Sequence, residues 1–447
     1  MGAHARTSGP GVAVGGDGQP LAGIGGRPSE PAREAILSTV AAPSGIPSPG
    51  SGPGSGNFAA DLENFSEFGA PTRVETTDGL RYFINEFWTS RQRQAHRIHE
   101  VSYRACFKPQ LPRFYIQRLT VRNDIVYDPF MGRGTTPVEA ALAGRIPYGN
   151  DTNPLSKAFT EPRINPPALS EVVTRLGAIP WQTFTQVQHG ELAAFYHPET
   201  LAQIEGLRQW LLDRQDSGRL DPIDKWIRMI ALNRLTGHSS GFFSVYTLPP
   251  NQAVSLERQR IINRRRNQVP PRRDVPALIV RKSRSLLSAA APPAARDLLL
   301  LTEQSHETPQ IPSGTVSLTV TSPPFLDVVD YVTDNWLRCW FLGIDPRAVK
   351  LSQFRRVDHW QRFVRSTLVE LARITRSSGH IAFEVGEVRN GTVRLETQVV
   401  AAAEGLPLEV LGVMVNQQEF TKTSNCWGIA NNQRGTNSNR IVLMRKT

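Results

Sequence analysis

Two short motifs contain the residues whose types and spacing could do chemistry. In the first, an apolar run at 125–127 leads into Asp128, Phe130 and a Gly-x-Gly turn at Gly132 and Gly134. Glycines in such a turn let the backbone approach a ligand. The stretch therefore predicts a cofactor site at the end of a buried strand.

The residues after the turn complete a strand–turn–helix–strand–acid unit. Thr135 and Thr136 are residue types that start helices, the helical pattern extends to Ala143, and 146–149 form a second short strand. Asp151 follows that strand closely. Because an acid in this position can accept hydrogen bonds from ribose hydroxyls, we expect an adenosine-containing cofactor.

Spacing narrows the cofactor further. A dinucleotide fingerprint requires Gly or Ala three positions after the second glycine, where this chain has Pro137. The phosphate-binding pattern GxxxxGKS/T is also absent from the turn. These two exclusions favour a nucleoside cofactor that lacks a pyrophosphate, such as S-adenosylmethionine. An ordinary glycine turn is the alternative interpretation.

The second motif, which ends another apolar run, consists of Thr321, Ser322, Pro323, Pro324 and Phe325. Consecutive prolines fix the backbone, so the carbonyls of Ser322 and Pro323 should point rigidly outward. A hydroxyl and a fixed carbonyl could accept the two N–H bonds of an amine on a flat ring, while Phe325 stacks on that ring. We expect these residues to be catalytic, and a proline-stiffened loop is the alternative.

The two motifs, DPFMGRGTT and TSPPF, resemble the cofactor and catalytic motifs of amino-group DNA methyltransferases. The resemblance is closest to the N4-cytosine type, which reads TSPPY, whereas N6-adenine members more often have an acid in place of the threonine. Upstream, ACFKPQLP is similar to the family's cofactor-closing motif, and Phe107 in it could close over adenine or belong to the core. NRIVLMRK resembles the last strand, and the likeness extends from about Leu80 to the C-terminus.

The resemblance assigns roles residue by residue. It implies that Asp151 holds the ribose of S-adenosylmethionine. Ser322, Pro323 and Phe325 would clamp the target base. Arg133 stands where the family usually has Ser, so it would crowd the turn or contact DNA, and Phe325 replaces Tyr, which preserves stacking but loses a hydroxyl. The predicted cofactor-binding residues are Phe107, Asp128, Phe130, Gly132, Gly134, Thr135, Thr136 and Asp151.

Strand-like and helical patterns alternate along the chain except in its middle. This alternation predicts an α/β fold: a doubly wound, Rossmann-like methyltransferase sheet with an antiparallel C-terminal hairpin and a mainly helical inserted subdomain. Helical spacing predicts core helices at 191–214 and 222–235. The predicted parts are a disordered Gly/Pro/Ser-rich tail at 1–57, the first part of the methyltransferase domain at 80–162, a helical basic insertion at 163–298 and the second part at 299–447.

The insertion contains a dense basic run. Between Glu257 and Arg284 there are ten Lys or Arg residues and two acids. A charge run is usually a solvated surface, but the chain also carries a net charge of +11, which favours a polyanionic partner. Since the insertion lies between the two motifs, it resembles the target-recognition region of the family, and we expect it to contact DNA.

Composition argues against several other classes. No apolar run approaches the roughly eighteen residues of a membrane span, and the N-terminus lacks the pattern of a secretory signal. Cys106, Cys339 and Cys426 have no CxxC spacing, so we expect neither a disulfide framework nor a zinc site, and a cytoplasmic location fits best. Methylation at C5 of cytosine requires a cysteine thiolate, which in the family of C5 methyltransferases follows a proline. None of these cysteines follows a proline, so the sequence does not resemble that family at this point.

The combined hypothesis is a methyltransferase that moves a methyl group from S-adenosylmethionine to the N4 amine of cytosine in double-stranded DNA. Base flipping and direct transfer would need no metal. A cognate restriction endonuclease is a candidate partner, and no membrane contact is expected. One alternative is N6-adenine methylation. A second, from a different class, is a DNA-binding protein with an inactive methyltransferase domain, which Arg133 and Phe325 would favour.

Overall fold

The computed structural model describes residues 58–88, 95–103, 106–247, 253–295, 297–324, 331–345, 347–349, 354–386, 393–417 and 438–447. The predicted tail at 1–57 and Phe325 of the second motif lie outside these residues. All of the described residues belong to one compact unit. Within its described residues, no helix is long and apolar enough to cross a membrane.

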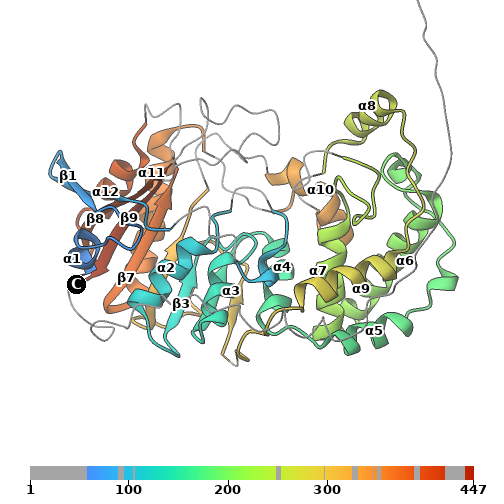
Figure 1. Cartoon of the computed structure of the whole chain (residues 1–447), viewed down its shortest axis with the longest axis horizontal. Coiled ribbons are helices and arrows are strands. Elements are labelled where there is room, and N and C mark those ends of the chain that lie inside the picture. Colours follow the sequence, from blue (N-terminus) through green and yellow to red (C-terminus); the bar gives the residue numbers. More distant parts are fainter. Residues whose placement is uncertain are drawn as a thin grey trace, which may run out of the picture. The chain divides into compact units, whose positions relative to one another are not determined.

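The fold is built on a nine-stranded sheet with the order β1-β2-β8-β9-β7-β6-β3-β4-β5 (Figure 1). Strands β5, β4, β3, β6 and β7 run parallel to one another. β9 is antiparallel to both of its neighbours, β7 and β8. The strands are β1 Arg73–Thr77, β2 Leu80–Asn85, β3 Ile125–Asp128, β4 Ile146–Asn150, β5 Leu299–Leu301, β6 Val316–Thr321, β7 Thr375–Val385, β8 Leu408–Gln417 and β9 Ser438–Lys446.

The chain extends the sheet in both directions from β3. It places β4 and β5 on one side, and β6 and β7 on the other. The carboxyl ends of β3 and β6, which pair through Val126 and Leu318, therefore flank a topological switch point, where open α/β sheets bind ligands. The predicted doubly wound sheet with an antiparallel C-terminal hairpin is confirmed.

β9 illustrates how both faces of the sheet are covered. Val442 and Met444 pack into a hydrophobic cluster with α11 and α12. Ile441 and Leu443 pack on the opposite face with α2. Side chains alternate along a strand, so a strand that is buried on both faces appears in the sequence as a continuous apolar run. The helices of this part are α1 Phe58–Glu63, α2 Gln110–Leu119, α3 Thr135–Leu142, α4 Pro154–Ile164, α10 Tyr331–Leu342, α11 Val357–Ile374 and α12 Leu395–Ala403.

One feature was not expected from the sequence, and another differs from the expectation. The strand β2, which contains Tyr82, forms a hairpin with β1 and pairs in parallel with β8, where Tyr82 lies opposite Val413. No local pattern predicts a pairing between segments so far apart in the chain. The helix expected at 191–214 begins only at Pro198, because a 3-10 turn at Gly190–Ala194 precedes it and proline favours the first turn of a helix.

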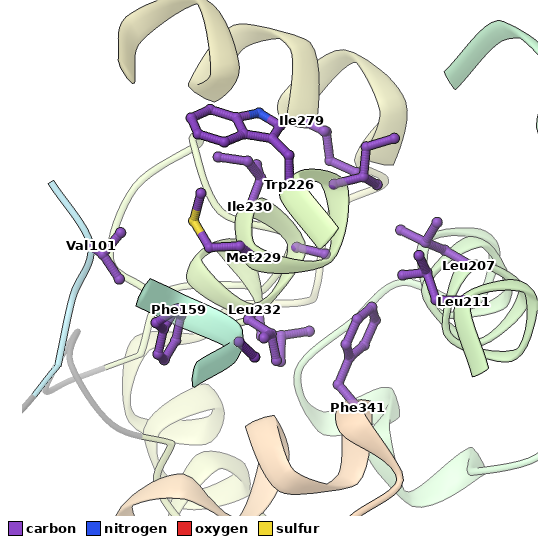
Figure 2. Packing of buried hydrophobic residues seen from close by; sticks show 14 of the residues in the cluster. Val101, Phe159, Leu207, Leu211, Trp226, Met229, Ile230, Leu232, Ile279 and Phe341 are labelled. Carbon is purple, nitrogen blue, oxygen red and sulfur yellow. The ribbon is translucent and has the colours of Figure 1, made fainter. Parts of the chain in front are cut away.

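The middle of the chain folds into a helical region. Its core includes Trp226, Met229 and Ile230 of α7, together with Phe159 of α4 and Phe341 of α10 (Figure 2). The helical region is therefore joined to the α/β part by a shared hydrophobic cluster as well as by the chain. Its helices are α5 Leu169–Gly177, α6 Pro198–Asp216, α7 Pro222–Arg234, α8 Leu256–Arg266 and α9 Val275–Leu286.

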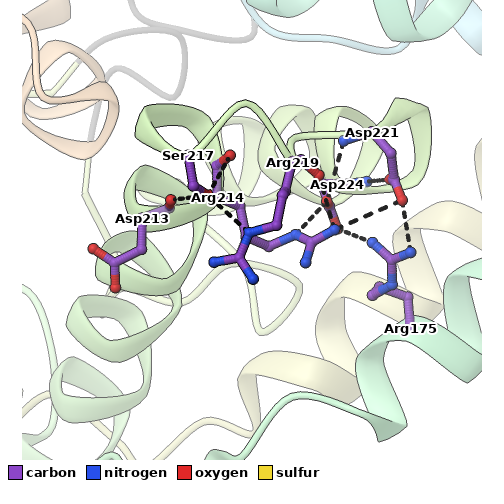
Figure 3. A network of polar contacts seen from close by, with 7 residues as sticks. All are labelled: Arg175, Asp213, Arg214, Ser217, Arg219, Asp221 and Asp224. Carbon is purple, nitrogen blue, oxygen red and sulfur yellow. Dashed lines mark hydrogen bonds and ion pairs between the residues drawn. The ribbon is translucent and has the colours of Figure 1, made fainter.

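Arginine–carboxylate pairs connect α5, α6 and α7 (Figure 3). Asp224 is fully buried in the first turn of α7 and accepts hydrogen bonds from Arg175 of α5 and from Arg214 of α6. The distance from Arg214 Nε to Asp224 Oδ2 is 2.6 Å. Asp221, the N-cap of α7, accepts a bond from Arg175 Nη2 at 2.6 Å. A buried carboxylate requires such partners, since burial without them is costly.

Candidate cofactor and substrate site

A pocket lies at the carboxyl ends of β3, β4, β5 and β6, at the switch point of the sheet. It brings together the glycine turn and the second motif, which are distant in the chain. Gly134, Thr136 and Thr321 are not among the residues that line it, and Phe325 lies outside the described residues. The predicted site residues that line the pocket are Phe107, Asp128, Phe130, Gly132, Thr135, Asp151, Ser322, Pro323 and Pro324.

The glycine turn has the backbone conformation that its sequence requires. Gly132 and Gly134 have positive φ angles of +50° and +77°, which favour glycine. Gly134 also precedes α3 as its N-cap. A Cβ atom there would lie 2.2 Å from Oγ1 of Thr160, so a larger residue would push α4 away. Gly134 thus supports the turn from behind the pocket.

Asp128, at the end of β3, is the most deeply buried acid of the pocket, with 1% of its surface exposed. One of its oxygens, Oδ1, accepts a hydrogen bond from Thr321 Oγ1 at 2.6 Å and one from the Phe130 N–H at 3.0 Å. Burial raises the pKa of Asp128 to about 7, although hydrogen bonds from Thr321 and Phe130 act to lower it. This carboxyl therefore exchanges its proton near neutral pH.

Thr321 and Thr136 hold the walls of the pocket together. Thr321 is fully buried and its hydroxyl is used by Asp128, so it joins β6 to β3. Thr136 Oγ1 donates to the carbonyl of Val320 at 3.0 Å, which joins α3 to β6. These bonds fix the position of the second motif relative to the glycine turn.

Asp151 stands just beyond β4 and is oriented by two backbone groups. Its Oδ2 accepts the N–H of Gly132 and its Oδ1 accepts the N–H of Asn153, both at 2.9 Å. Burial raises the pKa of Asp151, and these hydrogen bonds oppose the rise. Each oxygen retains a second lone pair, so the carboxylate can accept hydroxyl groups. Its binding of ribose stays a prediction.

The second motif is supported by two buried residues that the sequence did not single out. The Ser322 hydroxyl donates to Glu384, which lies at the end of β7 and is 6% exposed. Asn439 Nδ2 donates to Glu384 Oε1 at 2.9 Å. Burial raises the pKa of Glu384 despite these two bonds. The fully buried Trp360 of α11 donates from Nε1 to the Pro324 carbonyl at 2.9 Å, which fixes the proline segment.

Arg133 connects the glycine turn to the segment that precedes it in the chain. Its Nη1 donates to the carbonyl of Val101 at 3.0 Å, and its Nη2 donates to that of Phe107 at 3.4 Å. Its Nε donates to Thr135 Oγ1 at 3.2 Å. The guanidinium is not among the groups that line the pocket, so it does not crowd the turn and instead positions Phe107.

Other lining residues were not predicted. Glu303, Gln304 and Ser305 follow β5, and they could have been found from the rule that ligands bind at carboxyl ends of parallel strands. Phe363 of α11 lies with its ring centroid 5.6 Å from that of Phe130, a contact that only the tertiary structure reveals. The remaining lining residues are Tyr103, Cys106, Pro129, Met131, Thr152 and Asn153.

Cys106 is a pocket residue whose protonation bears on the chemistry. Burial raises the pKa of its thiol, which therefore stays protonated and is a weak nucleophile. Within the described ranges, no group of three or more His, Cys, Asp or Glu side chains could hold a metal ion.

Members of the basic run in the insertion differ in their partners. Two of them, just before and on α9, form ion pairs: Arg272 with Glu199 and Lys282 with Glu100. On α8, which lies at the periphery of the helical region (Figure 1), the arginines are exposed. Across the part of the chain that the structure describes, no ion pair involves Arg258, Arg260, Arg264 or Arg265.

Comparison with known proteins finds similarity over part of the chain. Residues 63–158 match the family model of a DNA methylase (N6_N4_Mtase). The chain is 41% identical over 101 residues to the Type II methyltransferase M.MvaI of Kocuria varians. It is 35% identical over 74 residues to the Type II methyltransferase M.MjaII of Methanocaldococcus jannaschii. The two alignments cover 21% and 17% of this chain, and they span only 21% and 14% of the length of these relatives.

Among solved structures, TrmN from Thermus thermophilus is similar over 78% of this chain and 52% of its own, with 11% identity and a TM-score of 0.31. The strand order and the strand directions define a doubly wound α/β fold with its pocket at the switch point. Residues 63–158 are similar to the amino-group DNA methylases, in agreement with the resemblance that the motifs predict. The second motif lies outside the segment that the family model matches.

Proposed function

We propose that this protein transfers a methyl group from S-adenosylmethionine to the exocyclic N4 amine of cytosine in double-stranded DNA. The observation that carries the proposal is the hydrogen bond between Ser322 and the buried Glu384, at the pocket that also contains the glycine turn and Asp151. A proton acceptor that is buried, paired with a hydroxyl and adjacent to a nucleoside-type pocket suits methyl transfer to an amine.

The residues present fit this cofactor. Asp151 offers acceptors to ribose hydroxyls, and Phe130 and Phe363 give the pocket an aromatic wall. Phe107, whose carbonyl is held by Arg133, lies on the pocket as well and is suited to contact the adenine. When bound, S-adenosylmethionine supplies an electrophilic methyl group on a positively charged sulfur.

Ser322 and Glu384 are suited to accept the proton that an aromatic amine loses on methylation. The lone pair of such an amine is delocalised into the ring, and acceptors placed at its N–H bonds return electron density to nitrogen. With Glu384 ionised, the Ser322 hydroxyl donates to Glu384 and its oxygen can accept one amine N–H, while the Pro323 carbonyl accepts the other. When the amine nitrogen takes up the methyl group, its proton would pass through Ser322 to Glu384. A raised pKa makes Glu384 a better proton acceptor.

DNA would be held by the insertion. The exposed arginines of α8 have the charge and freedom required for contacts with phosphates, whereas Arg272 and Lys282 have acidic partners. The target base would be flipped into the pocket, at a cost of a few kcal/mol for unstacking. The two named relatives are Type II methyltransferases, which supports a place in restriction–modification with a cognate endonuclease as partner.

The test is nucleoside analysis of DNA that has been incubated with the protein and labelled S-adenosylmethionine. The expected product is N4-methylcytosine. The motif has Thr321 where an acid is more typical of adenine-specific members, which supports cytosine as the target. Label in N6-methyladenine would replace the cytosine assignment with an adenine one. Label only at C5 of cytosine, or no label in DNA, would overturn the proposal.

A further inference from the structure

A second cavity lies outside the candidate active site, between α6, the start of α8 and α10. It is open, with a volume of about 760 Å³, which is within the usual range for ligand pockets. We propose that this cavity binds an unstacked nucleobase of the DNA substrate. The choice of DNA as the ligand rests on the proposed function, whereas the choice of a flat aromatic group rests on the cavity itself.

Two tryptophans form the main wall of the cavity. Trp336 and Trp340 are one turn apart on α10, so they share a face of that helix, and both are partly exposed. Trp336 Nε1 donates to the carbonyl of Val254 at 3.3 Å, which fixes the orientation of the indole. Leu256 and Ile344 extend the apolar surface. A rigid indole wall of this kind suits stacking with a planar ring.

Arg208 of α6 gives the cavity a positive charge, because its two other charged lining residues, Asp345 and Arg347, pair with each other. Its Nε donates to the carbonyl of Trp340 at 2.8 Å, and its guanidinium carbon lies 5.2 Å from the centroid of the Trp340 ring. A guanidinium in this place favours ligands that carry negative charge near an aromatic ring. A nucleotide combines these two properties, since its base is planar and its phosphate is anionic.

The position of the cavity in the chain also favours DNA. Ser255, which caps α8, and Leu256, its first residue, line the cavity. The same helix continues with the exposed Arg258 and Arg260, so a strand bound along α8 would bring its bases toward the tryptophans. An apolar side chain of a protein partner could fit the indole wall, but it would give these arginines no anionic partner.

A base in a duplex is stacked between its neighbours and cannot enter such a cavity. The ligand is therefore a base that has left the stack, such as one displaced when the target is flipped. Holding that base would offset part of the unstacking cost, because stacking of a base on an aromatic side chain contributes about 1–3 kcal/mol.

The test compares two DNA duplexes, one with a single bulged thymidine and one with an abasic bulge at the same place. Thymine has no exocyclic amine, so it is no methyl acceptor for the proposed reaction. In anisotropy titrations, the full chain should bind the thymidine bulge roughly fivefold or more tightly than the abasic bulge, as expected from base stacking. Trp340→Leu should abolish this preference and Trp340→Phe should retain most of it.

Matched variants distinguish binding of the base in this cavity from binding elsewhere on the protein. Trp210→Ala is the control, because Trp210 is on the same helix as Arg208 but packs by Arg214 and does not line the cavity. It should keep the thymidine preference, and thermal melting should show that all variants are folded. Ser322→Ala should keep the preference as well.

Three outcomes would overturn the inference. The first is an equal affinity of the native chain for the two duplexes, and the second is a thymidine preference that survives Trp340→Leu. The third is a thymidine preference that is lost in Ser322→Ala, because that loss would place the base in the catalytic pocket. A thymidine preference without any methylated nucleoside would overturn the proposed function alone.

Discussion

Carboxylates are held in opposite ways in two regions of the molecule. In the helical region, Asp221 and Asp224 accept hydrogen bonds from Arg175, and Asp224 also from Arg214 (Figure 3). Burial acts to raise the pKa of Asp221, but its bonds with Arg175 hold that pKa below the ordinary value. These carboxylates are charged partners in a network that connects three helices.

At the end of the sheet the donors are neutral. Asp128 and Asp151 accept bonds from hydroxyl or backbone N–H groups, and Glu384 from Ser322 and Asn439. Without a cation in contact, burial dominates and raises the pKa of all three carboxyls. The difference shows that the donor decides how burial shifts the pKa of a carboxyl: the cationic donor Arg175 outweighs the rise at Asp221, whereas hydroxyl and N–H donors do not outweigh it at the end of the sheet.

The largest expected effect is on stability in the helical region. Asp224→Ala removes a fully buried carboxylate and leaves the guanidinium groups of Arg175 and Arg214 without their central partner. We expect the free energy of unfolding to fall by about 3–5 kcal/mol. Chemical denaturation checks this, with Asp213→Ala, an exposed helix position nearby, as the control. A loss below about 1 kcal/mol would show that the network is not a main support.

The next effect is on chemistry at the end of the sheet. Ser322→Ala removes the hydroxyl that connects the pocket to Glu384. Turnover should fall by about 10²- to 10⁴-fold, the range typical for a lost proton-transfer group, while the affinity for the cofactor and the free energy of unfolding change little. Single-turnover kinetics measure the turnover, and calorimetry measures the affinity for the cofactor. An equal loss of turnover and cofactor affinity would contradict the role in holding the target base.

A smaller effect separates the two kinds of carboxylate by pH. Asp128 has a folded pKa of about 7, above its ordinary value of 3.8, so the folded protein binds more protons than the unfolded chain between these values. Its contribution to the free energy of unfolding therefore falls as pH rises through this window, by at most about 1.4 kcal/mol per pH unit. Asp221 has a lowered pKa, so its contribution is lost as pH falls through and below 3.8.

Measurements of the free energy of unfolding against pH for Asp128→Asn and Asp221→Asn test whether the two residues change stability with pH in opposite directions. The first variant should lose the decline toward neutral pH, and the second should lose part of the acid sensitivity. Identical dependence of stability on pH in the two variants would show that the carboxylates of the two regions do not differ in this way.

The smallest effect concerns the arginines that have no carboxylate partner in the described residues. Arg264→Gln on α8 should leave stability within about 0.5 kcal/mol and weaken DNA binding roughly fivefold at physiological salt, since one phosphate contact changes the salt slope by about 0.9. Arg272→Gln, whose arginine pairs with Glu199, should change that slope less. DNA-binding titrations at several salt concentrations measure the salt slope of each variant. Equal slopes for the two variants would mean that the arginines of α8 are only solvated and do not contact DNA.

Much of the first motif could be predicted because its interactions are local. The positive φ of Gly132, the start of α3 at Thr135 and the place of Asp151 after β4 all depend on residues that are close in the chain. Several parallel strands were recognisable for the same reason, because strands that are buried on both faces are rich in apolar and β-branched residues. The pairing of β2 with β8 was missed, because nothing near Tyr82 indicates its partner.

The sequence by itself determined the residue types of the two motifs, their order along the chain and the excess of positive charge between them. Only the tertiary structure decided which carboxylates meet arginines and which meet hydroxyls. In the folded chain, Glu384 accepts a hydrogen bond from Ser322, and Arg133 donates to backbone carbonyls. Thr321 and Gly134 do not line the pocket but contact Asp128 and Thr160, respectively. The physical reason is that pKa values and hydrogen bonds depend on neighbours in space, and the sheet brings these neighbours from distant parts of the chain.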